Sequence, residues 1–117
     1  ERSIKRMIDI SELESKIVER MKPLDPEKII LFGSYASGNP REDSDIDLYV
    51  VTKDDFIPET WKEKNNIYLE VANRLQDILQ EHPTDLITHT KKMHEKFVEM
   101  NSSFAKDIME NGVVIYE

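Results

Sequence analysis

Two short apolar runs separated by one loop constrain the fold of this chain more than any other feature. The first run, residues 28–32, stops at Gly33 and predicts a buried strand that ends in a turn. The second run, residues 45–51, predicts another strand. Between them we expect a short helix that Ser34 caps and that Gly38-Asn39-Pro40 ends. The two strands therefore bracket a single loop.

Polar residues at the two ends of this loop indicate phosphate and metal chemistry. Gly33 has no Cβ to keep a ligand from its backbone, and Ser34 offers a hydroxyl and an amide to a phosphate at a helix N-terminus. Alternation along the second strand places Asp45 and Asp47 on one face, about 6.5 Å apart, with Ile46 on the other. At an effective dielectric near 20 these carboxylates repel by roughly 2 to 3 kcal/mol, which favours a cation between them.

Mg²⁺ suits such a pair because it takes hard oxygen ligands, usually one or two carboxylates together with substrate phosphates. Two such ions stabilise both the attacking and the leaving oxygen of a phosphoryl transfer. The alternative is a solvated strand start in an acidic loop, of which Asp43 is an example. An isolated Asp-x-Asp or Gly-Ser carries little weight, whereas the two together, with this spacing and these strands, favour the functional interpretation.

At these residues the sequence resembles the DNA polymerase beta-like nucleotidyltransferase superfamily, whose motif is Gly-Ser, a spacer, and Asp-x-Asp on the following strand. Gly33-Ser34 and Asp45-Ile46-Asp47 match that motif. The family carries a third acidic residue on a later strand, and the resemblance assigns this role to Asp85. Many members have Arg where this chain has Ser37, so a phosphate contact from that position is not expected.

Composition limits the class of substrate. The chain has 117 residues, 34% of them charged, and no cysteine, so we expect one nucleotidyltransferase domain over residues 1–117 and no disulfide or thiol chemistry. The net charge of −8 argues against binding long nucleic acid, which needs clustered Lys and Arg. No apolar run is long enough to span a bilayer, so we expect no membrane association and a cytoplasmic location.

The remaining periodicities predict a mixed α/β fold, in which helices pack on a small mixed sheet. A helix capped by Ser11 comes before the first strand, and one long amphipathic helix follows the second and ends by Glu81. The Asp85 strand comes next, then helices broken near Asn101-Ser102, and a short terminal strand over residues 113–116.

Four other polar side chains are weaker candidates. Tyr35 follows Ser34 and is a candidate nucleotide-binding residue that stacks on a base, with packing in the loop as the equal alternative. The histidines at 82, 89 and 94 lack metal-ligand spacing and are expected on the surface or at helix caps. We expect His89 to lie beyond the end of the Asp85 strand, away from the metals.

The chain resembles the minimal nucleotidyltransferases, whose catalytic domain stands alone and works with a separate helical protein of the HEPN class. The resemblance implies an antitoxin that transfers AMP from ATP to a tyrosine of that toxin, with two Mg²⁺ ions. Asp45 and Asp47 would hold the ions, Gly33 and Ser34 the triphosphate, and Asp85 would hold a metal or act as the base. Two alternatives stay open: a homo-oligomer that modifies a small hydroxyl compound such as an antibiotic, and an antitoxin that acts by occlusion.

Overall fold

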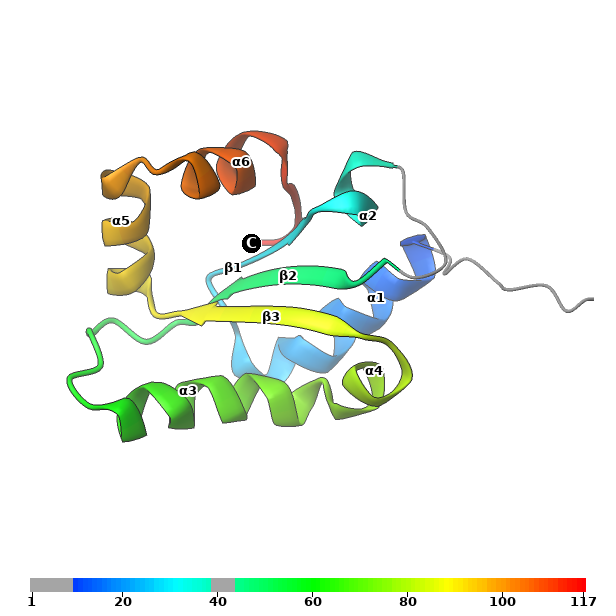
Figure 1. Ribbon diagram of the computed structural model, residues 1–117. Coiled ribbons are helices and arrows are strands. Elements are labelled where there is room, and N and C mark those ends of the chain that lie inside the picture. The colour runs from blue at the N-terminus through cyan, green and yellow to red at the C-terminus, as the bar shows by residue number, and fades with distance from the viewer. Residues whose placement is uncertain (1–9, 39–43) are drawn as a thin grey trace, which may run out of the picture.

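The computed structural model describes residues 10–38 and 44–117, and in these ranges four strands form one mixed sheet in the order β3-β2-β1-β4 (Figure 1). Strand β2 is antiparallel to β1 and parallel to β3, while β4 is antiparallel to β1. The strands are β1 (Lys28–Phe32), β2 (Ile46–Val51), β3 (Thr84–His89) and β4 (Val113–Tyr116). The expected small mixed sheet with packed helices is confirmed.

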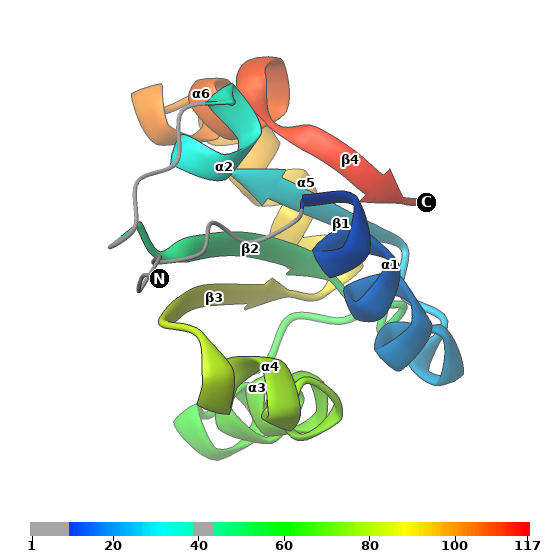
Figure 2. The same ribbon diagram turned by 90° about the vertical axis from the view of Figure 1, so that its right-hand side faces the viewer.

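Helices cover the two faces of this sheet unequally, as Figures 1 and 2 show. One face packs on α1 (Ile10–Met21), α3 (Trp61–Arg74) and α4 (Gln76–Glu81), and the other on α5 (Lys91–Met100) and α6 (Ser103–Asn111). The first face forms the larger core, with Leu13, Ile17, Met21, Ile29, Leu31, Tyr35, Ile46, Leu48, Val50, Val71, Leu75 and Ile78. The second core contains Ile30, Phe32, Tyr49, Val51 and Ile108. Alternation along β1 and β2 sends successive side chains into these two cores.

Side-chain caps explain where three of the helices begin. The hydroxyl of Thr60 accepts a hydrogen bond from the Glu63 N–H at the start of α3, at 3.1 Å. Thr90 caps α5 and Ser102 caps α6 in the same way. Asn101, at φ 52°, ends α5, so the expected break near Asn101-Ser102 is confirmed. We expected Ser11 to cap α1, but Ser11 lies within that helix, so this expectation is wrong.

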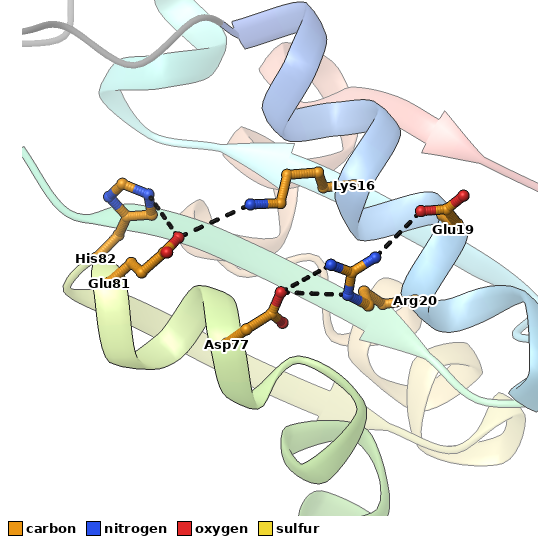
Figure 3. A network of polar contacts seen from close by, with 6 residues as sticks. All are labelled: Lys16, Glu19, Arg20, Asp77, Glu81 and His82. Atoms are coloured by element: carbon orange, nitrogen blue, oxygen red, sulfur yellow. Dashed lines mark hydrogen bonds and ion pairs between the residues drawn. The ribbon is translucent and has the colours of Figure 1, made fainter.

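The long helix expected to reach Glu81 is instead interrupted at Leu75, which separates α3 from α4. The break lets α4 turn back toward α1, and Figure 3 shows the polar contacts that join these two helices. Arg20 donates from Nε and Nη2 to Asp77 Oδ2, at 3.2 and 2.8 Å, and Lys16 lies 3.7 Å from Glu81. The hydrogen bond from Arg20 lowers the pKa of Asp77. These tertiary contacts are not visible in the periodicity of the sequence.

Within the described ranges, every helix is too short or too polar to cross a membrane.

Candidate active site

One end of the sheet gathers the residues that the sequence singled out. The last residue of β1, Phe32, is paired with Asp47 near the start of β2, and Asp47 is paired with Asp85 near the start of β3. Residues that face each other across neighbouring strands point to the same side of a sheet. Asp47 and Asp85 therefore lie on the same face of the sheet, the one on which α5 and α6 pack. The short helix α2 (Ser34–Ser37) lies at the same end of the sheet as these two aspartates (Figure 1).

Asp47 carries the electrostatic signature of this cluster. Its side chain is half-buried, whereas Asp45, immediately before β2, and Asp85 are both exposed. Loss of solvent raises the pKa of Asp47 above its ordinary value, and the negative charges of Asp85 and then Asp45 raise it further. Asp85 and Asp45 thus lie close enough to repel the charge of Asp47.

Gly33 brings the turn backbone against the Asp47 carboxylate. It adopts φ 75° and ψ −152°, a region that is open to glycine almost alone. A Cβ at this position would lie 2.9 Å from Asp47 Cγ and would clash with Oδ2. The Gly-Ser turn and the aspartate strand are therefore fitted to each other, and a larger residue at position 33 would displace the carboxylate.

The short helix α2 has the length expected, but its cap differs from the prediction. Gly33 occupies the N-cap position without a side-chain cap, and Ser34 is the first helical residue, so Ser34 does not cap the helix as expected. The Ser37 hydroxyl donates to the Ser34 carbonyl at 3.0 Å. Gly38, at φ 83°, ends the helix as predicted, whereas Asn39, Pro40 and Asp43 lie outside the described residues.

The side chain of Tyr35 is buried in the protein. Its side chain is only 5% exposed and packs in the larger core, and this burial raises the pKa of its hydroxyl. The ring therefore packs inside the protein, as the alternative interpretation held, and is not available to stack on a base. No local pattern indicates this burial, because a helix of four residues is too short for periodicity to show which side a tyrosine faces.

The residues at this end of the sheet fit a Mg²⁺ site that is completed by substrate. In the part of the chain that the structure describes, no three His, Cys, Asp or Glu side chains form a ready metal cage. Mg²⁺ does not require one, since it is usually bound by one or two carboxylates together with phosphate oxygens and water. Asp45, Asp47 and Asp85 supply hard oxygen donors. A cation among them would offset the burial and the repulsion that together raise the pKa of Asp47.

Two histidines form a separate cluster at the opposite end of β3. His89 is the last residue of that strand, so our expectation that it lies beyond the strand end is wrong. The buried Tyr49 hydroxyl lies 2.9 Å from Nδ1 of His89 and 2.7 Å from Nδ1 of His94. Burial lowers the pKa of His89 to about 4. These two rings are packing elements rather than the surface or capping residues we expected. His82, in contrast, occupies the C-cap position of α4, as expected, and lies half-buried beside Glu81.

The sequence of the chain matches the family described as polymerase beta, nucleotidyltransferase, over residues 14–117. This chain belongs to that family. The matched span includes Gly33, Ser34 and all three aspartates. The chain is therefore a nucleotidyltransferase, as the resemblance implied.

Individual relatives agree with this assignment. A Methanocaldococcus jannaschii protein with the provisional name protein adenylyltransferase is 31% identical over 116 residues, which are 99% of this chain and 97% of the relative. Two toxin–antitoxin crystal structures share the fold at 23% identity, one with AMP-PNP (TM-score 0.58) and one of an MntA–HpeT variant (TM-score 0.56). Each covers 88% of this chain and 72% of the solved chain.

A third structure, from Sulfolobus solfataricus and provisionally described as a nucleotidyltransferase, is 16% identical with a TM-score of 0.55. It covers 92% of this chain and 79% of the solved chain. At these identities the three structures show that the fold is shared.

Proposed function

We propose that this chain is a Mg²⁺-dependent adenylyltransferase that moves AMP from ATP to a tyrosine hydroxyl of a partner toxin of the HEPN class, and so acts as an antitoxin. We also propose that residues 1–117 act as one nucleotidyltransferase domain in the cytoplasm. The observation that carries the proposal is the meeting of Asp47, Asp85 and Gly33 at one end of the sheet. Carboxylates beside an open glycine turn are the groups that phosphoryl transfer requires.

The choice of AMP and of a protein acceptor rests on the comparisons. The archaeal relative that matches nearly the whole chain has the provisional name protein adenylyltransferase. Two solved structures that share this fold are toxin–antitoxin complexes, and one of these contains the ATP analogue AMP-PNP. The other is a variant in which two aspartates, two positions apart, are replaced by glutamate. Asp45 and Asp47 have the same spacing.

Each residue has a distinct role in the proposed reaction. The turn at Gly33 and Ser34 would bind the triphosphate, while Asp45 and Asp47, with Asp85 as a third ligand, would hold two Mg²⁺ ions. When bound, Mg²⁺ would neutralise negative charge on the phosphates of the substrate. The acceptor oxygen attacks the α-phosphorus, a bond to that phosphorus forms, and the bond from it to the bridging oxygen of the β-phosphate breaks.

Pyrophosphate leaves with that bridging oxygen, and the proton of the acceptor hydroxyl goes to a carboxylate, for which the exposed Asp85 is the candidate. Positioning and neutralisation of charge, rather than covalent catalysis by the protein, would supply most of the acceleration.

Transfer of label from ATP tests the proposal. Purified protein is incubated with Mg²⁺, a candidate partner toxin of the HEPN class, and ATP labelled at the α- or the γ-phosphate. We expect the toxin to acquire only the α-label, and to acquire none with Asp47→Asn. Asp55→Asn, which removes an exposed carboxylate away from the site, is the matched control and should transfer as the wild type does.

Other outcomes contradict the proposal in different ways. A toxin that is neutralised without label, equally by wild type and Asp47→Asn, indicates occlusion. Label on a small hydroxyl compound, and none on the toxin, indicates a small-molecule nucleotidyltransferase. Label from the γ-phosphate would contradict nucleotidyl transfer itself.

A further inference from the structure

A groove lies directly beside the candidate active site. It has a volume of about 430 Å³ and lies between α2 and α6, with Phe32, Gly33, Ser37, Asp107 and Asn111 as its lining. The helices α2 and α6 are neighbours in both Figure 1 and Figure 2. Phe32 and Gly33 also contact or pair with Asp47, so the groove opens directly beside the carboxylates.

On α6, an aromatic ring comes before the two polar side chains that line the groove. Phe104, Asp107 and Asn111 lie at i, i+3 and i+7 along α6, which places them on one face of the helix. Phe104 is 47% exposed, and its ring contacts the buried ring of Phe32 edge to face, with centroids 5.8 Å apart. This helix therefore combines exposed aromatic surface with hydrogen-bonding groups.

The polar groups of the groove are mostly acceptors in a fixed arrangement. Nδ2 of Asn111 donates to Oδ1 of Asp107 at 2.8 Å, which orients the amide. One N–H and the carbonyl oxygen of Asn111, together with the second carboxylate oxygen of Asp107, are then left to bind a ligand. The negative charge of Asp107 disfavours phosphate at this place. The groove therefore suits a neutral ligand that carries an amino group.

We infer that this groove binds the nucleoside part of ATP, with Asn111 and Asp107 recognising the amino-bearing edge of adenine. The inference rests on the proposed function and extends it to recognition of the adenine base, for which the sequence contains no motif. The volume is within the range of ligand pockets. Asparagine pairs with the N6 amino group and N7 of adenine through two hydrogen bonds, and the adjacent Asp107 oxygen is a further acceptor for an amino group.

Binding measurements test this assignment without relying on turnover. With Mg²⁺ present, we would measure by calorimetry the affinity of the full chain for four ligands. They are ATP, GTP, purine riboside triphosphate, which lacks the amino group, and inorganic tripolyphosphate. The variants are Asn111→Ala and Asp107→Asn. Glu110→Gln removes one negative charge from the same helix outside the groove and is the matched control.

We expect the wild type to bind ATP roughly 5- to 100-fold more tightly than the analogue without the amino group, as one good base contact provides. The ratio should fall to near one in Asn111→Ala and Asp107→Asn and stay unchanged in Glu110→Gln. Tripolyphosphate affinity should not fall in either groove variant, which also shows that the variants are folded.

Three results would overturn the inference. The first is equal affinity of the wild type for ATP and for the analogue without the amino group. The second is a preference for ATP that remains in both Asn111→Ala and Asp107→Asn. The third is tighter binding of GTP than of ATP. In each of these cases the proposed function would still be supported if the protein binds tripolyphosphate and transfers the α-label to the toxin. Failure of the wild type to bind either ATP or tripolyphosphate would overturn the proposed function together with the inference.

Discussion

Replacing Asp47 by Asn should stabilise the metal-free protein, although it removes a residue that we assign to the active site. Asp47 is paired with Asp85 across neighbouring strands, which lie about 5 Å apart in a sheet. At that separation two unit charges repel by about 3 kcal/mol at an effective dielectric of 20 and by about 0.8 kcal/mol in water. Because Asp85 and Asp45 are exposed, solvent screening favours the lower end, and we expect a gain of about 1 kcal/mol.

The gain should depend on pH with a defined sign. The pKa of Asp47 is raised in the folded protein, so the folded state holds this proton at pH values where the unfolded chain has released it. The wild type therefore loses stability as the pH rises from about 4, the ordinary value of the unfolded chain, through the pKa of the folded state. The difference between Asp47→Asn and wild type should be absent in acid and complete at pH 7.

Urea unfolding in EDTA, followed by circular dichroism at pH 3 and pH 7, measures this difference. For 117 residues, about 1 kcal/mol corresponds to roughly 3 to 5 °C in Tm. Asp55→Asn should change stability little at either pH. Excess Mg²⁺ should stabilise the wild type more than Asp47→Asn. Equal or lower stability of Asp47→Asn in EDTA at pH 7, or the same gain in Asp55→Asn, would contradict the proposed repulsion between Asp47 and Asp85.

Three further predictions follow from side-chain and backbone geometry. Gly33→Ala should lower the free energy of unfolding by about 1 to 3 kcal/mol and weaken ATP binding, measured by urea unfolding and calorimetry, because the Cβ meets Asp47 at a glycine-only conformation. Tyr35→Phe should bind ATP like the wild type, whereas Tyr35→Ala should cost about 3 to 5 kcal/mol of stability, since the ring is core. The pKa of His89 is lowered to about 4, so on acidification the unfolded chain binds a proton at this imidazole before the folded protein does. The free energy of unfolding should therefore fall by up to about 3 kcal/mol as the pH is lowered from 6.5 to 4, and this fall, measured by urea unfolding, should be smaller in His89→Leu.

Local patterns in the sequence predicted the strands, although β2 begins at Ile46, one residue after the predicted start at Asp45. The first strand is indicated by a β-branched apolar run that ends at Gly33. In the next run, two Asp residues two positions apart are expected on one face of a strand, and this expectation needs no tertiary information. The helix break near Asn101 was likewise visible, since a left-handed residue followed by a serine cap is a local signal. Asp85 was assigned by resemblance, and its pairing with Asp47 is a property of the folded sheet.

Tertiary contacts account for what the sequence did not reveal. The break at Leu75 comes with the contact between Arg20 and Asp77, which are far apart in the chain. The burial of Tyr35 and the position of His89 beside Tyr49 depend on which helices cover each face of the sheet. The groove beside Gly33 could not be anticipated, because it exists only where α6 returns to α2.

The intact mass of the partner shows whether adenylyl groups are transferred to it. The protein is purified with its associated proteins from its native host, as wild type and as the double variant Asp45→Asn/Asp47→Asn, and each component is weighed by mass spectrometry. Our account predicts a helical partner that is heavier by one or more AMP units with the wild type and unmodified with the variant. A partner that is unmodified with both forms, and held equally by both, would contradict adenylyl transfer through these aspartates.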